Sequence, residues 1–519
     1  MLNKPKLNPC YRLDQESEGI FLQSERASVI LSDALDQLLL SLLEESHSAE
    51  EIVERILPQL LSENPSIEDA VNAGFKVFYK LDQMEQQGYI TESSEQLPLP
   101  SAIFCNHLNI DIEKAHYSLQ NTKVSVTSLG SVSTTELIDI LESMQIKVAE
   151  EGDIKVVLTD DYLQEDLQKL NQKCLDEKRP WMLVKPVGTV LWIGPIFYPD
   201  KTGCWECLAQ RLRNNRPIER FIQRRKKISR PLPLPLSTLP STLQTALGMT
   251  ATEIFKWIVQ EENKRVEGSL ITYDTLSLET HNHILVKRPQ CPSCGAKALL
   301  SKERKPLPII LGNRKKVFIT DGGHRCCLPQ ETWQKYQHHI SPITGVVRAL
   351  EKVSLAWNNL THTYVAKHHF ATTFDDLTSL RQNITGRSAG KGRTEEQAIA
   401  SAFGEAIERY SSVFQGDEIR QQSSYQQMGE RAIHPNKCMN FSQEQYRTRQ
   451  EWNANCSGLF QKVPEPFDEE REIEWTPVWS LNHEDFKYLP TAYCYHGYPQ
   501  LDRKSTRLNS SHTVISYAV

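Results

Sequence analysis

The chain has 519 residues, a formal net charge of −6 and 24% charged residues. That length predicts about three domains with sizeable cores, and nothing in the charge or composition indicates a nucleic-acid or membrane partner. No apolar run reaches the roughly 18 residues that a membrane helix needs, and no signal-peptide pattern is seen, so we expect a cytoplasmic protein.

Residues 1–95 are predicted to form a small α+β domain. Short strands are expected at 11–14, 19–23 and 29–31, and three helices follow, the second opened by a capping box of Ser48 and Glu51. The third helix begins near Ser66 and is predicted to turn four apolar side chains inward: Val71, Phe75, Phe78 and Leu81. This combination is typical of a winged helix-turn-helix, but the third helix is too poor in basic residues for DNA binding.

Residues 103–304 are predicted to form an α/β domain. Strands and helices alternate from residue 123 to 184, which favours a parallel sheet covered by helices. The first strand leads into Leu129–Thr134, where one glycine replaces the several that a nucleotide-binding loop needs. We therefore expect a scaffold without nucleotide binding. The basic run from Arg211 to Arg230 is interpreted as a solvated helix followed by a loop.

Four of the twelve cysteines form two Cys-x-x-Cys pairs, Cys204 with Cys207 and Cys291 with Cys294. Two such pairs supply four thiolates within tetrahedral reach and leave no open position for a substrate. The sequence therefore predicts a structural Zn²⁺ site. A chain of this size with so few cysteines does not need a disulfide scaffold, which again favours a reducing cytoplasm.

The third domain, predicted from residue 305 to 501, contains the stretch Ser388–Tyr410. Its Gly-Lys-Gly sequence at 390–392 is interpreted as a loop whose backbone N–H groups, together with Lys391, suit phosphates. A helix capped by Thr394 follows, with Ser401, Glu405 and Glu408 on one face. Two carboxylates one turn apart favour a bound cation such as Mg²⁺, and the alternative is a solvated acidic face.

The stretch Ser388–Tyr410 resembles the first nucleotide-binding motif of the YcaO family. Other matching stretches extend the resemblance over nearly the whole chain: Leu158–Leu163, Leu183–Val187, Thr202–Cys207, Asp321–Arg325 and Glu474–Ser480. Within the family the resemblance is to the cyanobactin heterocyclases. These ATP-dependent cyclodehydratases convert Cys, and sometimes Ser or Thr, of a ribosomal precursor peptide into azolines. The resemblance implies ATP, Mg²⁺ and a structural Zn²⁺ as cofactors.

The resemblance also implies roles for single residues. Ser401 would contact ATP and Glu405 and Glu408 would hold Mg²⁺, while Ser388, Lys391 and Arg409 would be further ATP contacts. The catalytic residues themselves stay unassigned. The N-terminal domain would clamp the precursor's leader between a strand edge and its third helix, at these residues: Gly19, Ile20, Phe21, Leu22, Gln23, Ser24, Phe78, Leu81 and Gln87.

For the larger parts of the chain, the resemblance implies a ThiF-like scaffold at 103–304 and the N-terminal part of a YcaO domain at 305–501. Family members often dimerise, but no pattern in the sequence decides whether this chain forms a homodimer. Residues 502–519 lose apolar periodicity and back-translate to a common short-read sequencing adapter, so we expect a non-native tail. The family's second pair of Mg²⁺ carboxylates is then missing, and we expect a truncated, inactive enzyme.

Two other functions stay open. An adenylating enzyme acting through the middle domain would need the glycine-rich loop that Leu129–Thr134 does not supply. A non-catalytic scaffold that binds the precursor peptide would need only the N-terminal domain.

Overall fold

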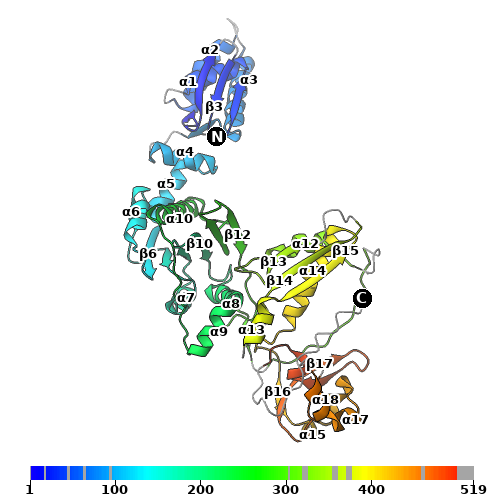
Figure 1. The fold of residues 1–519 in the computed structure, drawn as a ribbon. Coiled ribbons are helices and arrows are strands. Elements are labelled where there is room, and N and C mark those ends of the chain that lie inside the picture. Colours follow the sequence, from blue (N-terminus) through cyan, green and yellow to red (C-terminus); the bar gives the residue numbers. More distant parts are fainter. Residues whose placement is uncertain are drawn as a thin grey trace. The chain divides into compact units, whose positions relative to one another are not determined.

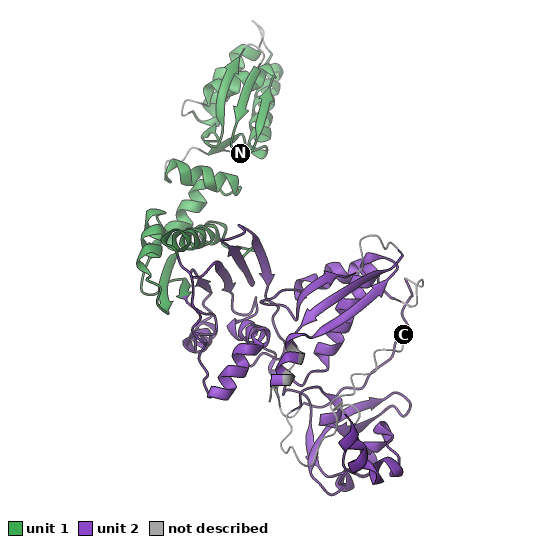
Figure 2. Cartoon of the chain, in the orientation of Figure 1, with its two compact units in different colours: residues 1–158, 239–267 green, residues 159–238, 268–519 purple. Residues whose placement is uncertain are grey.

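The computed structural model describes residues 2–16, 19–43, 47–61, 66–92, 96–301, 304–317, 325–353, 360–369, 377–456 and 462–498. The chain divides into two compact units, residues 1–158 with 239–267 and residues 159–238 with 268–519 (Figure 2). Its separate sheets and many helices confirm the predicted multidomain α/β and α+β class (Figure 1). Within the described ranges no helix is both long and apolar enough to cross a membrane.

The first unit begins with strands and helices close to those predicted. They are β1 (Pro5–Leu7), β2 (Arg12–Glu16), β3 (Gly19–Gln23), β4 (Ser28–Leu31), α1 (Ala34–Leu42), α2 (Ala49–Leu60), α3 (Ile67–Gln86) and β5 (Ile90–Glu92). Strands β2, β3 and β4 form an antiparallel sheet in that order, and β1 pairs with β5. Ser48 and Ser66 each form a capping box, with Glu51 and Asp69, which fixes where α2 and α3 begin.

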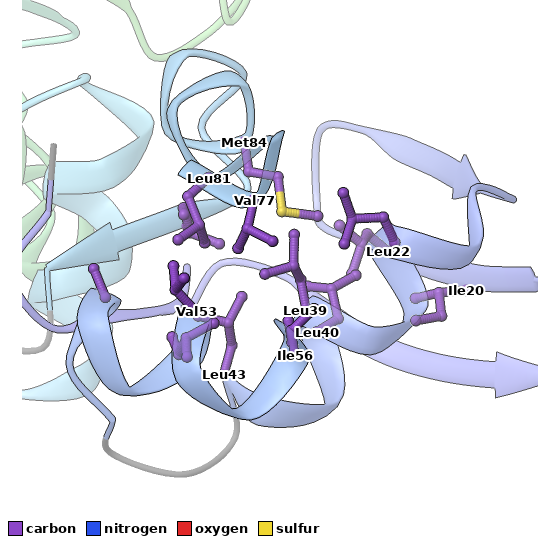
Figure 3. Packing of buried hydrophobic residues seen from close by; sticks show 14 residues of the cluster. Ile20, Leu22, Leu39, Leu40, Leu43, Val53, Ile56, Val77, Leu81 and Met84 are labelled. Carbon is purple, nitrogen blue, oxygen red and sulfur yellow. The ribbon is translucent and has the colours of Figure 1, made fainter. Parts of the chain in front are cut away.

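Side chains from β3 and from all three helices form the core of this part of the chain (Figure 3). From α3 the buried residues are Val77, Leu81 and Met84, with Phe78 packed beside them. Val71 and Phe75 are instead 50% and 69% exposed, so the prediction that they turn inward is wrong. Helix α3 carries two apolar stripes, and helical periodicity alone cannot tell which of them faces the core.

The remainder of the first unit is an α/β region. Its elements are α4 (Leu99–His107), α5 (Ile112–Asn121), β6 (Lys123–Leu129), α6 (Thr135–Ser143), β7 (Lys147–Val148), β8 (Ile154–Thr159) and α10 (Pro240–Gln260). Strand β6 lies between β7 and β8 and pairs with β7 in parallel. Helix α10 packs on α5 and α6, with Phe255 edge-on to Phe104. The predicted alternation of strands and helices is confirmed here.

The second unit begins with a region that contains the cysteine pairs. Its elements are α7 (Asp166–Asp176), β9 (Trp181–Lys185), β10 (Val190–Phe197), α8 (Trp205–Asn215), α9 (Pro217–Lys226), β11 (Ser269–Asp274), β12 (Thr280–Ile284) and α11 (Lys297–Leu300). Strands β9 to β12 pair antiparallel in chain order. The parallel arrangement predicted for residues 123–184 therefore does not continue into β10, because the short connection between β9 and β10 forms a hairpin and contains no crossover helix.

A helix-covered sheet carries the stretch 388–410. It comprises α12 (Pro329–Tyr336), η1 (Gln337–His339), β13 (Val347–Lys352), β14 (His362–His368), α13 (Leu377–Ile384), β15 (Arg387–Gly392) and α14 (Glu395–Ser411). The sheet is antiparallel in the order β13-β14-β15, and α14 packs on it through Ala398, Ala402, Phe403 and Ala406. We call β13, β14, β15 and α14 the nucleotide element.

Short helices and a second antiparallel sheet complete the second unit. They are β16 (Gln421–Ser423), α15 (Tyr425–Met428), η2 (Gly429–Arg431), α16 (Asn436–Met439), α17 (Gln443–Arg447), α18 (Arg449–Asn455), β17 (Ile473–Ser480), β18 (Asp485–Pro490) and α19 (Thr491–Cys494). The sheet order is β16-β17-β18, with Trp475 buried against Met428 and Ala432. The predicted tail at 502–519 and most of the matching stretch Asp321–Arg325 lie outside the described residues.

The Gly-Lys-Gly sequence at 390–392 belongs to a strand, and the prediction of a phosphate loop there is wrong. Strand β15 runs directly against the backbone of α14. A Cβ atom at Gly390 would overlap the backbone nitrogen of Ala402 and the carbonyl oxygen of Ala398. The glycines therefore allow a close approach of strand and helix.

We predict that Gly390→Ala destabilises the second unit by about 3 kcal/mol or more, because two backbones would have to separate. Gly404→Ala on α14 is the matched control. That glycine has open space around its Cβ position, so alanine should raise helix stability by up to about 1 kcal/mol. Denaturant unfolding of both variants checks this, and equal stability of Gly390→Ala and the parent would contradict it.

Candidate functional site

The four paired cysteines come together in the second unit. The Sγ atoms of Cys204 and Cys291 are 3.6 Å apart, those of Cys207 and Cys294 are 3.5 Å apart, and all four lie within 4.8 Å of one another. Four sulfurs at about 2.3 Å from a Zn²⁺ ion would be about 3.8 Å apart, so the group has the size of a tetrahedral site. We call these four residues the tetrathiolate cluster.

The backbone around the tetrathiolate cluster favours metal-binding thiolates. Cys204 occupies the N-cap position of α8 and Cys207 lies in the first turn, where the helix dipole favours thiolates. The second pair lies in a tight turn in which the Gly295 N–H donates to the Cys291 carbonyl at 2.8 Å. The Arg288 N–H donates to the Cys207 sulfur at 3.4 Å, a contact that supports a ligating thiolate.

The acidities of the thiols also fit a metal site. Hydrogen bonds from the Cys204 and Cys207 thiols lower the pKa of Cys294 to about 7. Hydrogen bonds to Cys207, Cys291 and Cys294 raise the pKa of the Cys204 thiol, and burial raises it further by a smaller amount. Cysteine ligands bind a metal as thiolates, so metal binding at the cluster would release protons.

The predicted Mg²⁺ ligands lie on α14. Ser401 and Glu405 are half-buried and Glu408 is exposed. Glu405 accepts a hydrogen bond from the Ala389 N–H at 3.0 Å and forms an ion pair with Arg409. Arg409 also donates to the Arg387 carbonyl at 3.2 Å. Glu405 and Arg409 thus lie along the edge of β15 that β14 does not pair with, and both stay partly accessible to solvent.

The two predicted ATP contacts on β15 point to opposite faces of the sheet. Lys391 is exposed, but Ser388 is only 1% exposed and lies on the face that packs on α14. Its hydroxyl is 3.0 Å from Nε2 of His368, whose pKa burial lowers to about 4, so the ring is neutral at pH 7. Ser388 is therefore buried in this structure, and its contact with ATP stays a prediction.

The predicted leader residues lie on or directly after β3 and the C-terminal half of α3, and their role in leader binding stays a prediction. Strand β3 is the central strand of its sheet and pairs with β2 and β4, so its residues have no free edge. Gly19, Ile20, Leu22 and Leu81 are buried as well. Of the predicted set, the residues with partly or fully exposed side chains are Phe21, Gln23, Ser24, Phe78 and Gln87. The order of antiparallel strands is set by tertiary packing, which the sequence does not reveal.

An exposed apolar stripe on α3 is the feature that the sequence interpretation missed. Its members are Ile67 (86% exposed), Val71 (50%), Phe75 (69%) and Tyr79 (64%). Their spacing of four residues keeps them on one side of the helix. Lys80, beside Tyr79, pairs with Asp33 and Asp36, which follow β4, so α3 lies next to the end of that edge strand. We call these four residues the α3 stripe.

Comparisons with known proteins give a consistent result. Residues 389–513 match the family model described as YcaO cyclodehydratase, ATP- and Mg²⁺-binding. A solved structure titled as a heterocyclase in complex with substrate and cofactor is 40% identical, with a TM-score of 0.84 over 96% of this chain. The heterocyclase TruD is 33% identical, with a TM-score of 0.75 over 96% of this chain. The chain spans 66% and 64% of those two proteins. The search of curated proteins found no match.

We predict that Cys207→Ser abolishes metal binding and destabilises the second unit by several kcal/mol, because the binding energy of a structural metal is folding energy. Elemental analysis of the parent should find one zinc per chain, and the variant should have none. The matched control is Cys174→Ser, since Cys174 is a buried thiol outside the cluster. A well-folded parent that contains no metal would contradict this prediction.

Proposed function

The chain belongs to the YcaO cyclodehydratase family, and we propose that it acts in the ATP-dependent conversion of cysteines in a ribosomal precursor peptide to thiazolines. The observation that carries this proposal is the position of Glu405 on α14 beside the edge of β15 that pairs with no described strand, with Glu408 one turn further on, within the part that matches the family model. Because the chain spans less than two thirds of the two heterocyclases, the activity of the whole protein is part of the proposal.

The residues of α14 fit the binding of a metal–nucleotide complex. Glu405 is held in place by the Ala389 N–H and by Arg409, so its carboxylate needs little reorganisation to bind a cation. Glu408 lies one turn further on and is exposed, so it can join the same ion. ATP with Mg²⁺ would supply the phosphoryl group that turns the amide oxygen of the substrate into a leaving group.

The metal site and the peptide site have supporting roles in the proposal. The tetrathiolate cluster would hold a structural Zn²⁺, because all four positions are taken by cysteine and none is left for a substrate. The leader of the precursor would add as a strand to the edge of β4 that pairs with no described strand, and it would cover the α3 stripe. An exposed stripe of four large apolar side chains suits an extended peptide with apolar side chains, and Lys80 of the same helix pairs with Asp33, which follows β4.

We predict that Glu405→Gln and Glu408→Gln, each introduced into the full-length protein, lower its precursor-dependent ATP turnover about 10²-fold or more, since charge stabilisation is usually the largest catalytic contribution. Glutamine at 405 can still accept from the Ala389 N–H, so the fold should be kept. Glu396→Gln is the matched control, because Glu396 is an exposed carboxylate in the first turn of the same helix.

Calorimetric titration with Mg²⁺ and a non-hydrolysable ATP analogue gives a second measurement that needs no turnover. A variant that carries both Glu405→Gln and Glu408→Gln is compared with the parent in both measurements. Equal turnover and equal affinity would show that the two carboxylates are only part of a solvated acidic face. Leader binding by a parent that neither binds nor hydrolyses ATP would instead favour the non-catalytic peptide scaffold.

We predict that Phe75→Asn with Tyr79→Asn weakens leader binding at least about tenfold, because burying each aromatic side chain contributes about 1.5–3 kcal/mol. Fluorescence anisotropy with a labelled leader peptide measures this. Tyr117→Asn is the control, since Tyr117 is an equally exposed aromatic residue on α5 (69%) away from the α3 stripe. Equal affinity of the double variant and the control would exclude the α3 stripe as the leader site.

A further inference from the structure

One face of helix α8 joins the tetrathiolate cluster to the nucleotide element. Cys207, Arg211 and Asn215 are spaced by four residues and therefore lie on the same side of the helix, with Cys204 one turn before them. The helix has 11 residues and is about 16 Å long. Its first turn supplies two of the four thiols, and its last turns contact residues of the sequence 343–410.

Arg211 makes the contact with α14. The side chain is 9% exposed, and its Nη1 donates to the Tyr410 hydroxyl at 2.6 Å. The guanidinium carbon also lies 5.0 Å from the centre of the Tyr410 ring. Within the described part of the chain no carboxylate pairs with Arg211. A buried cation without a counter-ion is costly, and the double contact with Tyr410 offsets part of that cost.

Asn215 makes the contact with the sheet side of the nucleotide element. Its Nδ2 donates to the carbonyls of Ile343 and Gly345 at 3.1 and 3.2 Å. These carbonyls belong to the tight turn that leads into β13, and a side chain at Gly345 would overlap the backbone of Ser341. The C-terminal end of α8 thus holds both the helix and the first strand of the nucleotide element.

We propose that Arg211 is a positioning residue, through which metal binding at the tetrathiolate cluster orders the end of α14 that carries Glu405, Glu408 and Arg409. Tyr410 directly follows Arg409, so a shift of Tyr410 moves the last turn of α14 and the ion pair between Arg409 and Glu405. This inference rests on the proposed function for the role of α14, but the coupling itself involves no nucleotide.

The structure also contains contacts that could hold α8 without a metal. The Trp205 N–H donates to Oδ1 of Asn171 at 3.0 Å, and its indole N–H donates to the Tyr162 carbonyl at 2.8 Å. If these contacts suffice, the metal has no influence on α14. The proposal and this alternative predict different hydrogen-exchange patterns.

Hydrogen exchange of the full zinc-loaded chain, read out over residues 405–411, tests the role of Arg211. Arg211→Met should keep its zinc and speed exchange there at least about tenfold, since hydrogen bonds to charged groups are among the stronger ones. Arg213→Met is the matched control, because Arg213 pairs with Glu206 and stacks on Trp205 of its own helix. The Arg213→Met variant should exchange at residues 405–411 at the same rate as the parent. Unchanged exchange in Arg211→Met would overturn the proposal.

A Tyr410→Phe variant distinguishes positioning from a general loss of packing. Alone it should speed exchange at 405–411 less than Arg211→Met does, because the ring contact remains. Combined with Arg211→Met it should add little, since both changes remove the same hydrogen bond. Fully additive effects would overturn the proposal.

Removal of zinc from the parent with a chelator tests the metal's part. Exchange should rise together in the first turn of α8 and in 405–411, and in Arg211→Met the further rise in 405–411 should be less than about twofold. A rise confined to α8 would show that the contacts of Trp205 suffice and would overturn the proposal. Failure of the parent to bind Mg²⁺ with ATP would contradict the proposed function and leave this result unaffected.

Discussion

The close packing of a strand on a helix backbone is the constraint on which the nucleotide element depends. Gly390 lets β15 approach α14 more closely than any side chain would allow. At that distance Glu405 reaches the Ala389 N–H and Arg409 reaches the Arg387 carbonyl. Glu405 is therefore positioned by a backbone contact and by Arg409, and it keeps its place without a ligand.

Much of this arrangement could be predicted from the sequence, because it depends on local chemistry. The caps at Ser48 and Ser66, the twin Cys-x-x-Cys spacing and the helix after Thr394 all follow from short-range rules, and the structure confirms them. The predicted roles of Glu405, Glu408 and the leader-contacting residues in ligand binding stay predictions.

The wrong predictions share one physical cause, which is competition between local pattern and tertiary packing. A glycine-rich stretch suits a phosphate loop or a tightly packed strand equally well, and only the neighbouring helix decides that 387–392 is a strand. Helix α3 has two apolar stripes with the same helical periodicity, and only one of them is buried in the core. Arg211 was part of a basic run that we interpreted as solvated, yet it is buried beside Tyr410.

The side chains along β15 have a consequence for association between molecules. An unpaired strand edge is a template for a strand from another chain, and charged residues on the edge are a common protection. Glu405 and Arg409 use backbone groups of Ala389 and Arg387 that an incoming strand would need. The pair that we propose for the nucleotide site therefore also occupies backbone groups through which another strand could pair with this edge. A change that removed both charges would make the protein more prone to aggregate. Solubility and nucleotide binding therefore constrain the same two positions, 405 and 409.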